Sequence, residues 1–498
     1  QSFARIPLVS SPHIVHGNAL RLDWASVLPP DQCSYVVGNP PFLGKAYQSP
    51  EQKTDLERVM HGIKGAGVLD FVAGWYIKAG HYLQAAHAAG ETAPTCAFVS
   101  TNSITQGEQV PVLWSEMQRL GMEIQFAHRT FRWSNEASGK AAVHCVIVGF
   151  GLPSNASKVI YEYADISGPP LAVPAQNINA YLVDAPWVIL QNRKQPIGTV
   201  PPMQFGSMPN DGGHLLLSDE DKENLLAQEP QAAPWIKPFL GAEEFINLQS
   251  RWCLWLVDCP PGVLRGLHVV MSRVQKVKKT RESSSRANTQ SLALTPTLFG
   301  EIRQPREGNY LLIPRVSSEK RQFVPMGFLD AQTIASDAAL IVPNASLFHF
   351  GILTSTMHNA WMRFTCGRLK SDYRYSASIV YNNFPWPDAT GEALSDKHRQ
   401  AIEAAAQAVL DARAQFPDAS LADLYDPMSM PPALLKAHQK LDAAVDKAYE
   451  PAGGKKSWSS DAERVAFLFE LYQRITSLLP APNAKKTRKP KALVSEKI

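Results

Sequence analysis

Four consecutive residues, Asn39-Pro40-Pro41-Phe42, combine groups that can hold a planar amino group. The two prolines fix φ and remove two N–H donors, so this segment is rigid. The side-chain oxygen of Asn39 and the carbonyl oxygen of Pro40 remain as acceptors for the two N–H donors of an exocyclic amino group. Phe42 offers a flat face on which a planar base can stack, a contact worth about 1–3 kcal/mol. These groups favour attack of an amino nitrogen on an electrophilic methyl group, although a proline-rich turn without chemistry fits the four residues equally well.

The chain around this segment alternates strand and helix patterns. Short runs rich in Val, Ile and Phe predict strands at 35–38, 96–100, 123–128 and 143–150. Helical spacing of apolar residues predicts helices over 69–86 and 109–121. The alternation favours a parallel α/β sheet, in which ligands bind at the carboxyl ends of the strands. Too few residues separate the last two strands for a crossover helix, so we expect an antiparallel hairpin at the sheet edge.

The composition excludes several other classes of protein. With 45% hydrophobic and 19% charged residues, the 498 residues can form two to four folded domains. No run of 18 apolar residues is present, which argues against a membrane-spanning helix. The six cysteines form no CxxC pair, so we expect reduced thiols and no structural zinc site.

The proline-rich segment and its surroundings resemble the amino-methyltransferases of DNA, most closely the adenine-N6 class. The residues Asn39, Pro40, Pro41 and Phe42 match that family's catalytic motif. Upstream, the segment 16–20 (HGNAL) followed by Asp23 and Trp24 resembles the one that contacts the adenine ring of S-adenosylmethionine. Downstream, the segment 69–71 (LDF) is similar to the motif that borders the methyl-donor pocket. The resemblance therefore implies a cofactor site that contains Asn18, Ala19, Leu20, Asp70 and Phe71.

Two further motifs follow in the order expected for this class. The segment 98–103 (FVSTNS) resembles the next strand-and-turn motif, and 131–133 (FRW) resembles the motif whose aromatic side chain stacks on a flipped base. The resemblance thus assigns base stacking to Phe42, Phe131 and Trp133, with Phe131 slightly favoured over Trp133. The transfer of a methyl group needs no metal ion, and we expect none.

Later segments, at 317–328, 381–387 and 421–449, are similar to the MmeI-like large single-chain restriction–modification enzymes. The implied fold class is α/β: a partial, Rossmann-like class I S-adenosylmethionine-dependent methyltransferase sheet, then a mixed α+β, β-rich target-recognition domain and a C-terminal helical domain. We predict a catalytic half at 1–150, a connecting segment at 151–195, target recognition at 196–388, helices at 389–482 and a basic disordered tail at 483–498. The resemblance also implies a bacterial, cytoplasmic protein associated with the nucleoid.

The chain departs from this family before the proline-rich segment. Family members begin with a Gly-rich loop after the first strand and an acidic residue after the second, which hold the cofactor. Only 38 residues precede Asn39, and the segment 65–67 (GAG) is better explained as a flexible loop. We therefore expect that the first strands and the donor-binding loop are missing, and that the complete protein has an upstream methyltransferase region. In the resembling family a nuclease domain lies farther upstream, and the sequence leaves open whether the complete protein has one.

The basic charge is concentrated in residues 265–321, which contain 12 Lys and Arg against four Glu, whereas the whole chain has a net charge of +4. Such a concentration is typical of phosphate binding to double-stranded DNA, although a solvated basic loop is the alternative. The segment 276–291 is polar and loop-like, and we interpret it as a backbone clamp. The predicted DNA contacts are Lys276, Lys278, Lys279, Arg281, Arg286, Arg315, Glu319, Arg321, Arg368, Lys370 and Arg374.

Within this set, Glu319 and Arg321 are predicted to read bases, because Glu can accept from cytosine N4 and Arg can bind guanine O6 and N7. A surface ion pair explains the two residues equally well. A second cluster contains Arg363, Arg368, Lys370 and Arg374 with Tyr373 and Tyr375, and we expect it to contact the duplex near the flipped base.

These observations predict a site-specific methyltransferase that modifies adenine N6 in duplex DNA, within a restriction–modification or phage-defence system. Two alternatives remain open. A related methyltransferase could act on the glutamine amide of a protein or on RNA, since the segment 39–42 suits any planar amine or amide. A DNA-binding specificity module without catalysis is the other, because the donor site is incomplete.

Overall fold

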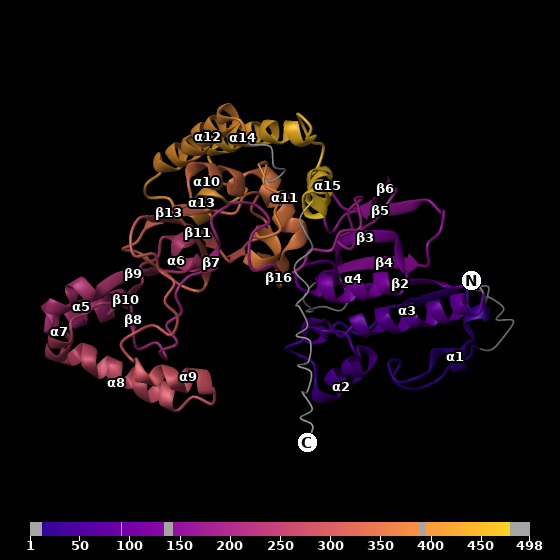
Figure 1. The fold of residues 1–498 in the computed structure, drawn as a ribbon, viewed down its shortest axis with the longest axis horizontal. Helices are drawn as coiled ribbons and strands as arrows, with labels where there is room; N and C mark the ends of the chain where they lie inside the picture. The colour runs from indigo at the N-terminus through magenta and orange to yellow at the C-terminus, as the bar shows by residue number, and fades with distance from the viewer. Residues whose placement is uncertain (1–11, 91, 134–142, 389–393, 479–498) are drawn as a thin grey trace, which may run out of the picture.

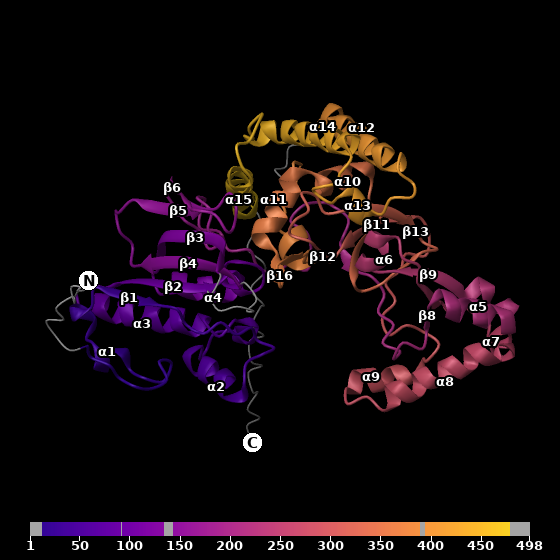
Figure 2. The ribbon, with the colours of Figure 1, turned by 180° about the vertical axis from the view of Figure 1, so that it is seen from behind.

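A computed structural model of the chain describes residues 12–90, 92–133, 143–388 and 394–478. Figures 1 and 2 show an arch: the N-terminal sheet and its helices form one side, and the segment from β7 to α9 reaches down on the other. Helices α12 (Asp396–Ala414) and α14 (Pro432–Tyr449) lie along the top, and α15 (Asp461–Leu478) returns to the N-terminal side. The tail predicted at 483–498 lies outside the described residues.

The N-terminal side is built on a six-stranded sheet with the order β1-β2-β4-β3-β5-β6. Its strands are β1 (Tyr35–Gly38), β2 (Thr95–Thr101), β3 (Glu123–Trp133), β4 (Val143–Gly151), β5 (Lys158–Glu162) and β6 (Leu171–Ala175). β1 and β2 are parallel, and β4 is antiparallel to both β2 and β3. The predicted α/β class and the predicted β3–β4 hairpin are therefore present, but the sheet is mixed rather than parallel throughout.

The hairpin does not lie at the edge of the sheet, so that prediction is wrong. β4 is inserted between β2 and β3, and the sheet continues through β5 and β6. Both additional strands come from the segment predicted to be a simple connection. Pro174 lies in β6, and an edge strand is where a sheet tolerates proline, because no neighbour requires its missing N–H.

Helices α3 (Ala73–Ala88) and α4 (Gln109–Arg119) pack on the sheet through large apolar side chains. Tyr76 of α3 stacks on Phe150 of β4 with ring centroids 5.2 Å apart, and it meets Phe98 of β2 edge-on. The buried hydroxyl groups of Tyr76 and Ser100 share a hydrogen bond of 2.8 Å. Two shorter helices, α1 (Trp24–Val27) and α2 (Pro50–Val59), lie beyond α3 (Figure 1). This packing holds the carboxyl ends of β1 and β2 at one edge.

The middle of the chain forms three small sheets rather than one. Their orders are β14-β9-β10-β8, β13-β11-β15-β7 and β12-β17-β16. The strands are β7 (Gln204–Phe205), β8 (Leu216–Leu217), β9 (Ile236–Leu240), β10 (Trp252–Leu254), β11 (Asn309–Pro314), β12 (Val316–Ser317), β13 (Gly327–Asp330), β14 (Ile334–Ala335), β15 (Ala339–Pro343), β16 (Gly367–Leu369) and β17 (Asp372–Arg374).

The same region is more helical than predicted. It contains α5 (Asp219–Gln228), α6 (Ala242–Asn247), α7 (Pro261–Gly266), α8 (His268–Glu282), α9 (Ala287–Ser291), α10 (Leu347–Thr354) and α11 (Thr356–Thr365). The predicted polar loop at 276–291 is mostly α8 and α9. The reason is a narrow buried stripe on α8, formed by Val270, Val274 and Val277, which packs into a core separate from that of the main sheet.

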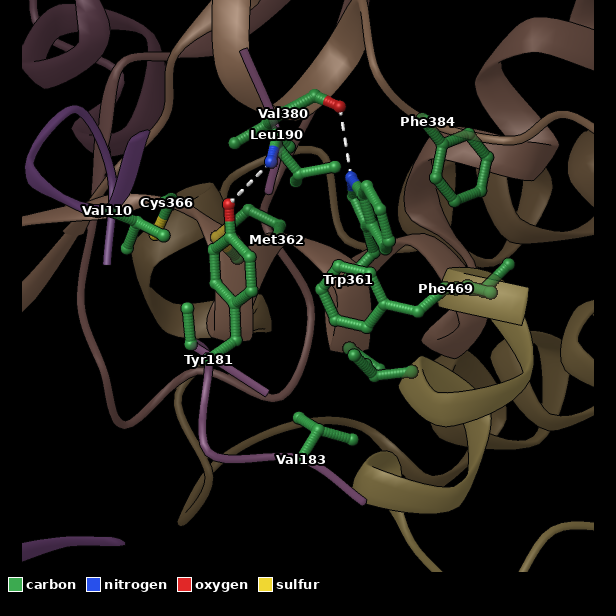
Figure 3. Close-up of a cluster of buried hydrophobic side chains, with 14 of the residues drawn as sticks. Val110, Tyr181, Val183, Leu190, Trp361, Met362, Cys366, Val380, Phe384 and Phe469 are labelled. Carbon is green, nitrogen blue, oxygen red and sulfur yellow. Dashed lines mark hydrogen bonds between the residues drawn. The ribbon is translucent and has the colours of Figure 1, made fainter. Parts of the chain in front are cut away.

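The C-terminal helices α12, α14 and α15 lie where the sequence predicts helices, with the short α13 (Leu421–Leu424) between the first two. Figure 3 shows the cluster in which α15 meets the other parts of the chain. Phe469 of α15 stacks on Tyr181 with ring centroids 5.0 Å apart and packs against Trp361 of α11. The indole Nε1 of Trp361 donates to the carbonyl oxygen of Val380 (3.0 Å). One continuous core therefore joins the sheet, α10, α11 and the C-terminal helices.

No helix among the described residues has the length and apolar character needed to cross a lipid bilayer.

Candidate functional site

The proline-rich segment follows β1 directly, at the carboxyl edge of the sheet. The side chain of Asn39 is exposed, and Pro40 is buried behind it. A hollow of about 360 Å³ opens here, within the size range of ligand pockets. Its lining consists of Trp24, Val36, Val37, Gly38, Asn39, Pro40, Pro41, Trp75 and Phe98. Asn39 and Pro40, the residues that carry the two predicted acceptors, therefore line an accessible concave surface.

Asn18, Ala19 and Leu20 shape a turn beside this hollow. Asn18 Nδ2 donates to Asp55 Oδ2 (2.8 Å), and Asn18 Oδ1 accepts from the N–H of Leu20 (3.0 Å). The side chain of Leu20 is buried, so only its backbone is open to a ligand. Arg21 also binds Asp55, and this hydrogen bond is the main reason that the pKa of the Asp55 carboxyl group is lowered. The turn is thus fixed by contacts within the protein.

Trp24 and Trp75 bring the predicted cofactor segments to the hollow. Trp24 Nε1 donates to the carbonyl oxygen of Ala19 (2.9 Å), and Trp75 meets Phe71 edge-on with centroids 5.3 Å apart. None of the five predicted cofactor residues lines the hollow itself in the described part of the chain. Trp75 is not among the predicted site residues, because the spacing of apolar residues along its helix indicates a buried core position. Its position near the start of α3, four residues after Phe71 of the predicted cofactor segment, is the signal that was available.

Asp70 lies behind the proline-rich segment rather than in the hollow. Its carboxyl group is buried, and burial raises its pKa above the usual value. Asp70 Oδ1 accepts from the N–H groups of Leu43 (3.0 Å) and Val72 (3.2 Å). The predicted contact of Asp70 with a methyl donor stays a prediction, and its observed partner is the backbone next to Phe42.

The aromatic residues predicted to stack on a base lie on two elements. Phe42 is half-buried next to the hollow. Phe131 stacks on Tyr163 with centroids 5.4 Å apart, so one face of its ring is covered. Trp133 is 38% exposed, near the end of β3. A bulge between His128 and Phe131 re-aims this end of the strand. Base stacking by these residues stays a prediction.

Four of the predicted phosphate-binding cations lie on α8 and the turn after it. Lys276, Lys278, Lys279 and Arg286 are exposed, and the lysines lie on α8 opposite its buried valines. Lys278 lies 3.9 Å from the carboxylate of Glu282, an exposed pair that contributes little to stability. These side chains are free to reach a phosphate backbone.

Arg281 lies on the same helix but points inward, and its predicted DNA contact is wrong. It is 0% exposed. Its guanidinium group donates to five backbone carbonyl oxygens, at distances of 2.8–3.0 Å. These acceptors belong to Pro209, Asn210, Leu292, Thr295 and Leu298. An arginine has five N–H donors, so this network leaves none for a phosphate.

We expect Arg281→Ala to lower the free energy of unfolding by at least about 3 kcal/mol, because several buried carbonyl groups lose their donors. Urea unfolding followed by circular dichroism measures this change. Lys278→Ala on the exposed face of α8 is the matched control and should change stability by less than about 0.5 kcal/mol. Equal stabilities of the two variants would contradict the structural role of Arg281.

Glu319 lies between the main sheet and β16, and it contacts a residue of each. Its Oε2 lies 3.7 Å from His144 Nε2 of β4 and 3.6 Å from Arg368 Nη1 of β16. The guanidinium group of Arg368 also stacks over Tyr373 at 3.9 Å. Arg321 is half-buried, and burial lowers its pKa while Asp372 and Asp426 oppose this change. In the absence of DNA, Glu319 therefore forms an ion pair with Arg368.

The second predicted cluster contains fewer surface groups than expected. Tyr373 and Tyr375 are buried, and Tyr375 shares a hydrogen bond of 2.7 Å with His358. Their expected contact with DNA is therefore wrong. Arg363 pairs with Asp461 of α15.

The exposed cations near this cluster are Lys370 and Arg374. Arg315 stacks over Phe205 at 4.8 Å.

The recognition region touches the carboxyl edge of the main sheet. Gly107, in the loop after β2, donates its N–H to the carbonyl oxygen of Thr365 (3.0 Å). A Cβ atom at Gly107 would lie 3.0 Å from the backbone of Gly367, and its φ of +60° also favours glycine. β16 therefore starts at the edge where β1 presents Asn39.

The described residues contain no group of three or more His, Cys, Asp or Glu side chains that could hold a metal ion.

Comparisons with known proteins identify three successive parts. Family models match as follows: “MmeI, DNA-methyltransferase domain” at residues 1–162, “MmeI, target recognition domain” at 184–388 and “MmeI, C-terminal domain” at 394–480. A solved structure of the Type IIL restriction-modification enzyme MmeI in complex with DNA is 51% identical with a TM-score of 0.83, and the match covers 96% of this chain and 62% of that chain.

A curated relative, DNA methyltransferase A of Bacillus subtilis (strain 168), is 38% identical over 474 residues, which are 95% of this chain and 51% of the relative. The chain thus spans about half the length of the curated relative that it matches. These matches confirm the predicted resemblance: the chain belongs to the MmeI family of DNA methyltransferases and carries the methyltransferase, target recognition and C-terminal domains of that family.

Proposed function

We propose that the complete protein transfers a methyl group from S-adenosylmethionine to the N6 atom of an adenine flipped out of duplex DNA. The observation that carries this proposal is the position of Asn39 and Pro40, at the carboxyl end of β1 and in the wall of an open hollow. The solved relative MmeI is a restriction-modification enzyme. We place this protein in such a system, or in phage defence, at the bacterial nucleoid.

The residues of the hollow are suited to hold and orient a nucleobase amine. Asn39 Oδ1 and the Pro40 carbonyl oxygen accept its two N–H groups, and Phe42 stacks on the ring. S-adenosylmethionine supplies an electrophilic methyl group when bound, and the flat side chains of Trp24 and Trp75 fit its adenine ring. Hydrogen bonds to the two oxygens polarise the amine, and its extra proton can leave after the attack. A strong general base and a metal ion are therefore not required.

We infer that residues outside the described ranges complete the donor site. Residues 18–20 and Asp70 with Phe71 support the two tryptophans and the proline-rich segment. In the part of the chain that the structure describes, β1 pairs only with β2, and Tyr35 and Val37 of this edge strand are 74% and 75% exposed. We propose that upstream residues of the complete protein, which could also include a nuclease, pair with this edge.

DNA contacts offset the cost of base flipping, which is a few kcal/mol. We assign phosphate binding to Lys276, Lys278, Lys279 and Arg286, whose side chains are exposed. Helix α8, which carries the three lysines, lies on one arm of the arch (Figure 2). Base reading is assigned to Glu319 and Arg321. We assign further DNA contacts to Arg315, Arg368, Lys370 and Arg374.

Arg321→Ala should change or relax the recognised sequence, because a bidentate contact to one base is worth about 1–3 kcal/mol of discrimination. Sequencing of methylated DNA from cells that produce the complete variant measures this change. Lys279→Ala, a phosphate contact, should weaken binding to all sequences equally and serves as the control. An unchanged methylation site in the Arg321 variant would refute its assigned role.

The experiment that tests the proposal uses the complete protein, duplex DNA and radiolabelled S-adenosylmethionine. We expect label on adenine, identified as N6-methyladenine by mass spectrometry of the digested DNA. Calorimetric titration with S-adenosylmethionine separates the alternatives, since absence of binding leaves only a DNA-binding specificity module. Label on RNA or on protein glutamine, with none on DNA, would instead support the other methyltransferase alternative.

A further inference from the structure

A buried glutamine links the proline-rich segment to the start of α3. Gln48 is 7% exposed and lies just before α2. Its Nε2 donates to the carbonyl oxygens of Leu43 (2.9 Å) and Leu69 (3.0 Å). One side-chain amide thus uses both donors to join two backbone segments that are 26 residues apart in sequence. Such a contact is costly to lose, because the carbonyl group of the fully buried Leu69 would lose this donor.

Both backbone polar groups of Leu43 are hydrogen-bonded. Its carbonyl oxygen also accepts from the N–H of Phe71 (2.9 Å), and its own N–H donates to Asp70 Oδ1 (3.0 Å). Asp70 is itself fixed, because its N–H donates to Gln109 Oε1 of α4 (2.9 Å). Every backbone polar group of Leu43 therefore has a partner at the start of α3 or on Gln48. We call this arrangement the Leu43 clasp: Leu43 with Gln48, Asp70 and Phe71.

The position of the clasp gives it a consequence for the acceptors. Pro40 and Pro41 have no N–H groups, so neither residue can donate a backbone hydrogen bond to the rest of the protein. Upstream, the ladder between β1 and β2 ends at the pair Gly38 and Phe98. Leu43 is the next anchored residue downstream. Pro40 and Phe42 pack against the protein within the segment 39–42, and the hydrogen bonds described here fix its two ends, one of them through the clasp.

We propose that Gln48 and Asp70 are positioning residues for methyl transfer: through Leu43 they set where the Asn39 and Pro40 oxygens meet the target amine. The inference rests on the proposed function and adds two residues to it. A displacement of about 1 Å at reacting groups can reduce a rate about 100-fold, so a small shift of Leu43 is sufficient to impair the transfer. Gln48 touches neither the amine nor the methyl donor in this account.

Gln48→Glu in the complete protein provides the test, because it keeps the size of the side chain but turns both donors into acceptors that face carbonyl oxygens. We expect kcat to fall about 10–100-fold, while KM for DNA and the dissociation constant for S-adenosylmethionine stay within about twofold. A protonated glutamate regains one donor, so the ratio of variant to wild-type kcat should rise as the pH is lowered. A structural role alone would not produce this pH profile.

Gln52→Glu is the matched control. Gln52 Oε1 accepts from the N–H of Ser49 in the capping box of α2, and a glutamate keeps that acceptor. This variant should retain the wild-type kcat.

Asp70 is tested by a conservative pair. Asp70→Asn keeps an oxygen acceptor for the N–H groups of Leu43 and Val72 and should retain most of kcat, whereas Asp70→Ala should lose it. A weakened affinity of Asp70→Asn for S-adenosylmethionine, at unchanged kcat, would show direct donor contact and overturn the positioning role.

The inference and the proposed function fail in different ways. If the wild-type complete protein does not methylate adenine, the proposed function is wrong. If it does, and Gln48→Glu has the same kcat and the same pH profile as the wild type, the clasp does not position the acceptors.

Discussion

Replacing Asn39 by alanine is expected to reduce kcat for methylation by at least about 100-fold, while the affinity for DNA stays within about twofold. The change removes one of two fixed acceptors for the target amine. Loss of one such preorganised group from an active site costs about 2.7–4 kcal/mol of transition-state stabilisation. The cations to which we assign phosphate binding lie on α8 and the turn after it, on a different arm of the arch, so binding should not change. Methyl transfer to a duplex with one target site measures kcat, and a gel-shift titration measures affinity.

Asn39→Asp is the control for this variant, because a carboxylate keeps the acceptor oxygen at the same distance from the backbone. We expect it to retain more activity than Asn39→Ala. Turnover of Asn39→Ala within tenfold of the wild type would refute the assigned role. A parallel loss of DNA affinity would show instead that the substitution has disturbed the fold.

A second large effect is expected from acid. His358 and His438 are buried, and burial lowers the pKa of each imidazole to about 3. His358 Nε2 shares a hydrogen bond with the Tyr375 hydroxyl (2.7 Å), and His438 Nε2 shares one with the Tyr425 hydroxyl (2.8 Å). The Nδ1 atom of each ring is buried without a partner among the described residues. Protonation would therefore add a charge and an unsatisfied donor to the core.

The direction in which stability changes with pH follows from the number of protons that the folded and unfolded chains bind. Each folded-state pKa lies below the unfolded value of about 6.5, so the unfolded chain binds more protons between pH 6.5 and 3. Stability is complete above pH 6.5 and is lost as the pH falls, by about 2.7 kcal/mol per pH unit for the two histidines together. Urea unfolding at pH 7, 6 and 5 measures the slope. His358→Gln should reduce the slope by about 1.4 kcal/mol per pH unit, and an unchanged slope would contradict the account.

Much of the catalytic side could be predicted from the sequence. The strands β1, β2, β3 and β4 have strong apolar or β-branched runs, and Asn39 follows the first of them in the structure. The order of the strands could not be predicted, because the insertion of β4 between β2 and β3 depends on long-range pairing. β5 and β6 were missed since Pro174 argues against a strand anywhere except at an edge.

The recognition region was harder to predict, because α8 is built from lysines and arginines around a narrow stripe of valines. Its charge suggests a solvated loop, whereas the spacing of Val270, Val274 and Val277 gives a helix with one buried face. Arg281 continues that face, and only the surrounding carbonyl groups show that it is a core residue. Gln48 carries no sequence signal at all: its role depends on two carbonyl groups that only the fold brings together.

The central claim is that Asn39 and Pro40 hold the amine of an extruded adenine. A crystal structure of the complete protein with its target duplex and S-adenosylhomocysteine measures this directly. We predict that the adenine N6 atom lies about 2.7–3.2 Å from both Asn39 Oδ1 and the Pro40 carbonyl oxygen, with Phe42 against the ring. A flipped base whose amine faces other acceptors, with these two oxygens turned away from it, would contradict the claim.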